Sequence, residues 1–461
     1  MATVLVGYWA ARRVKTSGDF MLAGRSLPVM LSSAALFATW FGSETVFGAS
    51  SEFLKGGLYS VIEDPFGAAL CLVLFGLFFA RKLYNMNLLT LGDFFKIRFG
   101  ARAELIASIF LAPPYAGYIA AQLVAMGLIL HVVTGLAVWQ GVLISAGVVT
   151  FYTYVGGMWA ISITDFIQSI IIILGLLVLA VVLSDQAGGM MKVIQNVHPE
   201  NFRFLPAPEL KEVISYLAAW SVLGLGSIPS QDVFQRAMSS GSAQTAVRSC
   251  YYAAILYLTV AMLPLFISLC TRQLYPDFVN GDTQLSLPNM VLSHTSLGIQ
   301  VLFFGSLLSA IMSTTSSAIL APAAIFSENL IRPLMKTKLS DERMLLLTRL
   351  SVLFFSGVAT AMACMRSNIY DLVGESSILS LVTLFAALVL GLHWKKASSA
   401  GAILSMVTGC LAWIGLEFVF ATGMPALVPA TLISVISMVL GSLIWPGTDT
   451  ESSQLSATRN S

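Results

Sequence analysis

The stretch that decides the fold is FATWFGSE, residues 37–44, which places hydroxyl residues, a glycine and an acid inside an apolar segment. A helix that breaks at this depth leaves backbone carbonyl and amide groups that lipid cannot satisfy. Such a break is tolerated only where the chain lines a cavity or is buried in protein. We therefore expect the first apolar span, residues 28–54, to be a broken helix beside a polar site.

A second interruption of the same kind occurs in the sixth apolar span, residues 211–235. It reads GLGSIPSQ at residues 224–231, with two glycines and a proline. Breaks five spans apart are the pattern of an inverted repeat whose broken helices form a binding site at the membrane midplane. The alternative is that glycine and proline are simply commoner in membrane helices, which accounts for one break more readily than for a matched pair.

The composition indicates a polytopic helical membrane protein. Hydrophobic residues make up 57% of the chain, charged residues only 10%, and the mean hydropathy is +0.84. Soluble domains carry about 25% charged residues. The apolar spans of helical length are expected at residues 28–54, 58–80, 104–134, 137–156, 159–184, 211–235, 249–271, 297–331, 344–364, 370–394, 397–420 and 425–446. Lysines and arginines fall mostly on one side of these twelve spans, which makes that side cytoplasmic.

A run of hydroxyl residues interrupts the eighth span. It reads LSAIMSTTSS at residues 308–317. Hydroxyls in a membrane helix need partners, so the run faces either a neighbouring helix or a polar cavity. The first reading is a small-residue helix interface. The second is an oxygen-lined site for a cation such as sodium, which prefers hard oxygen ligands.

Acids and histidines within or near the spans are candidate functional groups. Asp165, at the start of the fifth span, is either functional or a helix-start acid that complements the helix dipole. The four histidines have no partner at metal-ligand spacing, and no nucleophile–base set is visible. We therefore expect no enzyme, and no nucleic-acid partner.

Several motifs resemble those of the sodium:solute symporter family, in order along nearly the whole chain. They are GDFMLAGRS (18–26), YVGGM (154–158) with Thr164-Asp165, and AIMST (310–314). Within that family the likeness is nearest to the high-affinity choline transporter group. The stretches that carry it are ATW (38–40), Ile228-Pro229 with Gln231, FQR (234–236) and TAMA (360–363).

The resemblance implies a core of two inverted five-helix repeats with flanking helices. The expected organisation is residues 1–27, a truncated N-terminal helix (Met1–Ala11) and cytoplasmic linker; 28–184, the first repeat; 185–394, the second repeat with external loops; 395–446, two C-terminal transmembrane helices; and 447–461, a disordered cytoplasmic tail.

The resemblance also implies a sodium site. Its ligands would be the backbone carbonyls of Ala38, Phe41 and Ala310 and the side-chain oxygens of Ser313 and Thr314. Asp165 and Ser317 match positions that some members use for a second sodium ion. The coupling ion is thus expected to be Na⁺.

The solute site is expected between the two breaks. Choline-type sites cage a quaternary ammonium with aromatic faces. Trp40 and Tyr118 fit such walls, whereas Ala68 and Ser230 stand where the choline group has a tyrosine and a tryptophan. The candidate solute contacts are Trp40, Ser43, Tyr118, Ser230 and Gln231.

The sequence therefore predicts a sodium-coupled symporter in the plasma (cell inner) membrane. It would import a small polar organic solute, such as a zwitterion, an amino acid or a quaternary-ammonium-like compound, by alternating access. Its partners would be the solute, the sodium ion and the lipid bilayer. The alternative is a transporter-like membrane sensor with little transport activity.

Overall fold

Helices follow one another along the whole described chain. The computed structural model describes residues 16–278, 283–335, 340–366, 368–420 and 425–446, so the expected N-terminal segment Met1–Ala11 and the tail 447–461 lie outside the described residues. The α-helices are α2 (Ser17–Leu22), α3 (Val29–Phe37), α4 (Ala49–Gly56), α5 (Ala68–Leu74), α6 (Ala80–Asn85), α7 (Leu91–Phe99), α8 (Ala101–Leu111), α9 (Pro114–Thr134), α10 (Val138–Gln186), α11 (Met190–Gln195), α12 (Leu210–Gly226), α13 (Gln231–Met238), α14 (Ala243–Leu274), α15 (Ser286–His294), α16 (Leu297–Ile325), α17 (Arg332–Leu334), α18 (Asp341–Met365), α19 (Ile369–Ser380), α20 (Ala386–His393), α21 (Ser399–Ile414) and α22 (Leu427–Ile444). Shorter π-helical stretches are η2 (Glu44–Gly48), η4 (Ile62–Gly67), η5 (Phe75–Phe79), η9 (Phe326–Ile331), η10 (Leu381–Phe385) and η11 (Gly415–Val419).

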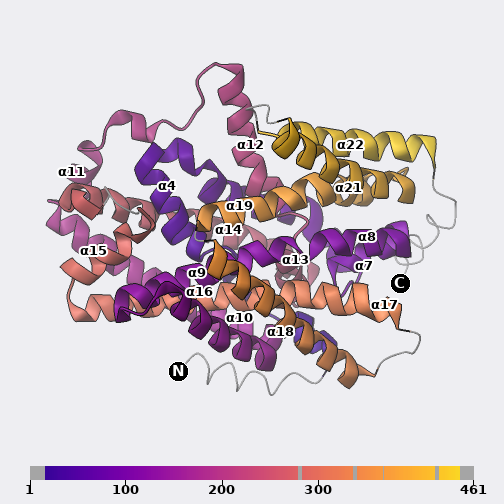
Figure 1. Ribbon diagram of the computed structural model, residues 1–461, viewed down its shortest axis with the longest axis horizontal. Helices are drawn as coiled ribbons and strands as arrows, with labels where there is room; N and C mark the ends of the chain where they lie inside the picture. The colour runs from indigo at the N-terminus through magenta and orange to yellow at the C-terminus, as the bar shows by residue number, and fades with distance from the viewer. Residues whose placement is uncertain (1–15, 279–282, 336–339, 367, 421–424, 447–461) are drawn as a thin grey trace.

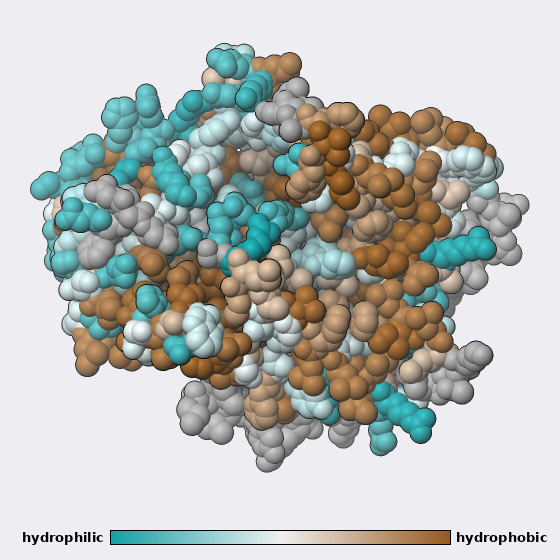
Figure 2. Space-filling model, viewed as in Figure 1, coloured by the Kyte–Doolittle hydropathy of each residue, from teal (hydrophilic) through white to brown (hydrophobic). Residues whose placement is uncertain are grey.

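The expectation of an all-helical membrane protein is confirmed. Ten helices within the described ranges are long and apolar enough to cross a membrane, and an eleventh crossing is counted if α12 and α13 form one bent span. Hydrophobic side chains cover α18, α21 and α22 on the face shown in Figure 2, and hydrophilic ones gather over α4 and α11. The apolar faces suit lipid contact.

The count differs from twelve because of the two broken spans. The first expected span contains α3, which is only nine residues long, and a turn at residues 38–42. From Glu44 the chain is helical again and runs, through bends, to Asn85, which also covers the second expected span. The first two expected spans therefore count as one crossing, and the sixth counts only if α12 and α13 are taken together. Each of the other expected spans corresponds to one helix that could cross a membrane.

The break in the sixth span is a bend of 47° between α12 and α13. Pro229 lies in the four-residue gap and cannot donate a backbone hydrogen bond. A Cβ added at Gly226 would lie 2.5 Å from the carbonyl oxygen of Ser377, so only glycine lets α12 approach α19 this closely. The second break and α19 therefore lie in direct contact.

The chain bends sharply again between the fourth and fifth expected spans. Helix α10 is interrupted at Gly157, where φ is 55°. A Cβ there would lie 2.5 Å from the Phe20 ring, so glycine serves both the bend and the packing of α2. This bend separates the expected spans 137–156 and 159–184.

Candidate functional site

Thr314, in α16, joins the eighth span to the break in the first. Its hydroxyl donates to the backbone carbonyl of Ala38 at 2.9 Å and lies 3.2 Å from the carbonyl oxygen of Ala310. The chain just after Phe41 approaches the same hydroxyl, because a Cβ at Gly42 would lie 3.2 Å from Thr314 Oγ1. The structure thus brings together Ala38, Ala310 and Thr314, three of the residues expected to hold the sodium ion.

Ser313 adds a hydroxyl oxygen without a partner. The side chain is 1% exposed, and its Oγ accepts or donates no hydrogen bond among the described residues. Buried polar atoms are normally paired, so an orphan beside freed helix carbonyls fits a ligand of a cation. No group of three or more His, Cys, Asp or Glu in the described part of the chain could hold a metal ion. The donor set of neutral oxygens therefore suits a weakly held sodium ion.

The residues expected at a second sodium site are linked by an arginine. Nη2 of Arg236, in α13, donates to Ser317 Oγ at 2.5 Å and lies 3.6 Å from Asp165 Oδ2. Arg236 and Asp165 are both almost completely buried, and neither carboxyl oxygen of Asp165 has a hydrogen-bond partner in the described ranges. Asp165 and Ser317 are thus near each other, with a protein cation in contact with both.

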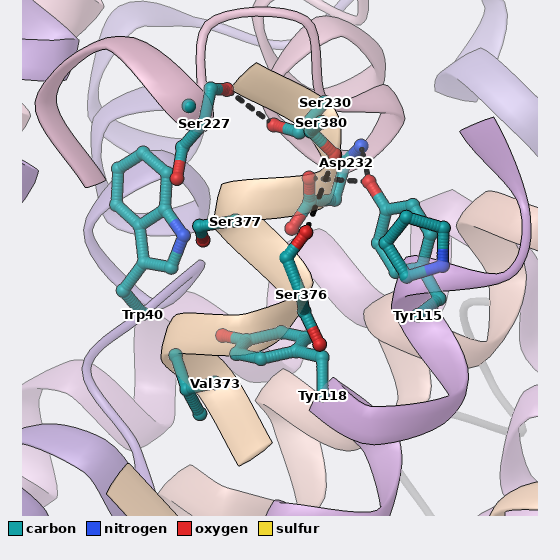
Figure 3. Close-up of a pocket in the computed structure, with 12 residues that line it drawn as sticks. Trp40, Tyr115, Tyr118, Ser227, Ser230, Asp232, Val373, Ser376, Ser377 and Ser380 are labelled. Carbon is teal, nitrogen blue, oxygen red and sulfur yellow. Dashed lines mark hydrogen bonds between the residues drawn. The ribbon is translucent and has the colours of Figure 1, made fainter. Parts of the chain in front are cut away.

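A cavity lies between the two breaks. It has a volume of about 390 Å³, including the space at its mouth. Four parts of the chain line it: the first break, the start of α9, the second break with α13, and α19. Figure 3 shows Trp40 on one side and Tyr115 with Asp232 on the other, and the α19 serines in the same view. The lining residues are Trp40, Pro114, Tyr115, Tyr118, Gly226, Ser227, Ser230, Asp232, Val373, Ser376, Ser377 and Ser380.

Among the described residues that line this cavity, Asp232 is the one acid, and none is a lysine or arginine. Its Oδ1 accepts hydrogen bonds from the Tyr115 hydroxyl at 2.7 Å and from the Val233 amide at 3.0 Å. The Asp232 amide in turn donates to the Tyr115 hydroxyl at 3.0 Å. The first turn of α13 is therefore already capped by the protein's own carboxyl and phenol groups.

Trp40 and Tyr118, two of the expected solute contacts, both line the cavity, and their contact with a solute stays a prediction. The Trp40 ring packs edge-on against Tyr257, with centroids 6.4 Å apart, so the indole is supported from behind. The Tyr118 hydroxyl lies 2.6 Å from the carbonyl of Thr39 and 2.9 Å from Glu44 Oε1. A phenol has one hydrogen, so both contacts are satisfied when Glu44 itself carries a proton on Oε1.

The other candidate solute contacts are placed differently. Ser230 lines the cavity, with its hydroxyl donating to the Ser227 carbonyl at 2.6 Å. The Ser43 amide donates to Gln122 Oε1, and Ser43 does not line the cavity. Gln231 accepts from the Leu91 amide at 2.7 Å, outside the cavity lining. A direct solute contact by Ser43 or Gln231 stays a prediction. The residue after Gln231, Asp232, lines the cavity.

Sequence reasoning missed Tyr115, Asp232 and the serines of α19. Asp232 is an acid near the end of the sixth expected span, residues 211–235, beside the second break. Ser376, Ser377 and Ser380 are hydroxyl residues on an otherwise apolar span, which is the same signal that marked residues 313–317. Their spacing of one and three places Ser376, Ser377 and Ser380 on one side of α19.

Comparisons with known proteins agree with this geometry. A family model described as the sodium:solute symporter family matches residues 20–409. The chain is 29% identical over 428 residues to the high affinity choline transporter 1 of Homo sapiens, covering 88% of this chain and 73% of that protein. It is 25% identical over 463 residues to the osmoregulated proline transporter OpuE of Bacillus subtilis, covering 96% of this chain and 93% of the other.

Solved structures show the same fold. A Na⁺-coupled sialic acid symporter in its substrate-bound outward-open state superimposes with a TM-score of 0.87, at 18% identity, covering 97% of this chain and 96% of that one. MHP1, a nucleobase-cation-symport-1 family transporter, gives a TM-score of 0.61 at 16% identity, and the match covers 94% of this chain and 97% of that one. The expected inverted-repeat core with broken first and sixth helices is confirmed by this likeness.

Proposed function

Because the chain belongs to the sodium:solute symporter family, we propose that it imports a small organic solute with a positively charged nitrogen, driven by sodium. Like its relatives, it is a membrane transporter and not an enzyme. The observation that carries the solute class is the cavity in which Asp232 stands among Trp40, Tyr115 and Tyr118, with no basic residue in the lining. Aromatic faces and a carboxyl group both attract a cation.

The capped start of α13 argues against a solute held mainly by a carboxylate. A solute carboxylate would use free amides at a helix start. Here the Asp232 amide donates to Tyr115 and the Val233 amide to Asp232 itself. A solute carboxylate would also meet the Asp232 carboxyl, which disfavours it.

A zwitterion is the second candidate. Relatives of the chain include a choline transporter and a proline transporter. Choline and proline share a positively charged nitrogen, and only proline carries a carboxylate. The hydroxyls of Ser227, Ser376 and Ser377, which also line the cavity, would have to receive that carboxylate. No observation in the described residues favours the sensor alternative.

The sodium ion would be held where α16 meets the first break. Ala38, Phe41, Ala310, Ser313 and Thr314 would supply neutral oxygens, and the unpartnered Ser313 hydroxyl supports this assignment. Such a site is weak enough to release sodium into a low-sodium cytoplasm. Asp165 and Ser317 would hold a second ion only if Arg236 moved away. We place the protein in the plasma (cell inner) membrane, across which cells maintain a sodium gradient.

Counterflow in proteoliposomes tests the proposal. Labelled choline, proline and a sugar are offered with and without a sodium gradient. We expect sodium-dependent uptake of choline or proline and none of the sugar. Asp232→Asn should weaken the affinity for a cationic solute by about 10- to 100-fold, because a charge-assisted contact is lost. Sodium-independent uptake would overturn the coupling, and an unchanged affinity in Asp232→Asn would overturn the solute class.

A further inference from the structure

An apolar groove separate from the solute cavity opens between the second, sixth and tenth expected spans. It encloses about 530 Å³, including its open mouth. Its walls come from the end of α5 with η5, from the end of α12 with the break that follows it, and from η10 with α20. Apolar side chains that line it include Leu74, Phe78, Leu225, Ile228, Phe385 and Val389. Phe78 is 50% exposed and its neighbour Leu77 57%, so the mouth of the groove faces the apolar surface that contacts lipid.

One end of the groove carries a histidine and is followed by basic residues. The His393 ring lies edge-on to Phe79, with centroids 5.6 Å apart, and so ties the end of α20 to the end of η5. Two residues beyond Phe79 the chain reads Arg81-Lys82, and two residues beyond His393 it reads Lys395-Lys396.

These four basic side chains are exposed, and none forms an ion pair within the ranges that the structure describes. The charge distribution along the chain places them at the cytoplasmic side. Basic side chains beside a crevice between membrane helices on this side suit an anionic headgroup.

The basic end of α20 is held in place by a buried arginine. Arg98 Nε donates to the carbonyl of Gly391 at 2.9 Å, and Nη2 donates to those of Trp394 and Lys395 at 3.2 Å each. Arg98 is 4% exposed, so it anchors the backbone and leaves the Lys395 and Lys396 side chains to the surface. The backbone that carries Lys395 and Lys396 is therefore held in position before any headgroup binds.

We propose that this groove binds an anionic phospholipid, with an acyl chain between η5, α12 and α20 and the phosphate on Lys82 and Lys395. Apolar walls and an unpaired basic rim match the two ends of such a lipid. The groove touches Leu225 and Ile228, which flank residues 226 and 227 of the solute cavity. A bound acyl chain therefore packs against the back of the broken sixth helix.

Retention of lipid after detergent exchange, counted by native mass spectrometry, tests the proposal. Phosphatidylglycerol is compared with phosphatidylcholine on the full chain. We expect selective retention of phosphatidylglycerol. Lys82→Gln and Lys395→Gln should each lower it about fivefold, and the pair roughly 25-fold, since each basic side chain contributes independently. Val389→Trp should lower retention by filling the groove.

Arg343→Gln is the matched control, because Arg343 is also exposed, lies at the start of α18 and does not line the groove. Equal retention of both lipids, retention unchanged in the paired variant, or an equal loss in Arg343→Gln would overturn the site. Lys82 and Lys395 lie in different parts of the chain, so one variant still reports if the other does not fold. Lipid retention is read without transport, so it is independent of the proposed solute and ion.

Discussion

The hydroxyl of Thr314 donates to the carbonyl of Ala38 at 2.9 Å, across 276 positions of sequence. This bond joins the hydroxyl run of α16 to the broken first helix. It occupies a carbonyl that a straight helix would have used internally. The same two residues would turn towards a sodium ion when it binds, so the bond marks where the ion site and the break meet.

Loss of the hydroxyls in this region should weaken sodium binding. We expect Ser313→Ala and Thr314→Ala each to raise the sodium concentration at half-maximal uptake by about tenfold, because each removes one oxygen ligand. The double variant should lose sodium dependence while remaining folded. Uptake by reconstituted protein at varied sodium concentration measures this.

Thr315→Ala is the control for those variants. Thr315 is equally buried, but its hydroxyl donates to the Ile311 carbonyl of its own helix. Its half-saturation for sodium should stay within about twofold of the wild type. If the double variant keeps the wild-type half-saturation, the sodium site lies elsewhere.

Asp165→Asn should affect coupling and stability together. The change leaves the buried Arg236 guanidinium without its carboxylate, which typically costs about 3–5 kcal/mol. We expect a lower melting temperature, partly restored in Asp165→Asn/Arg236→Gln, where the uncompensated charge is gone. The sodium:solute ratio is measured in parallel, and a ratio identical to the wild type would make Asp165 a structural partner of Arg236 alone.

Glu44→Gln should be tolerated where Glu44→Ala is not. The glutamine amide can donate to Tyr118 while its oxygen accepts from Gln122 Nε2, as a protonated Glu44 would. Alanine removes both contacts from a buried site, at a cost of roughly 1–3 kcal/mol. Thermal unfolding in detergent compares them. Equal destabilisation by both changes would show that Glu44 is ionised in the folded protein.

Ser230→Trp should shift the solute preference towards quaternary ammonium compounds. Ser230 lines the cavity, so an indole there would add an aromatic wall. One such wall contributes roughly 0.5–2 kcal/mol to binding of a cation. Competition by choline and by its neutral isostere 3,3-dimethylbutanol measures the shift; an equal gain for both would mean added apolar contact without a cation effect.

Much of the fold could be predicted from local sequence. Composition alone indicates a helical membrane protein, and GSIP within residues 226–229 predicts a break because Pro229 lacks a donor. The break at residues 38–42 follows from polar residues placed where a straight span would be apolar. The hydroxyl run at 313–317 likewise marked the neighbourhood of α16 that meets Ala38.

The residues that line the cavity could be predicted only in part. Trp40, Tyr118 and Ser230 line the cavity, whereas Gln231 bonds to Leu91 and the adjacent Asp232 faces Tyr115. Successive side chains on a helix point about 100° apart, so a rotation of α13 by one residue decides which of the two lines the cavity. The local sequence does not determine that rotation, because it is set by the helices that pack against α13.

The sequence by itself determined the class of protein, the positions of the two breaks and the chemistry of the hydroxyl run, because each depends on residues adjacent in the chain. Only the tertiary structure decided that Arg236 contacts both Asp165 and Ser317, and that α19 contributes Ser376 to the cavity. These contacts arise from the packing and rotation of helices far apart in the chain, where small residues such as Gly226 set how closely two helices approach.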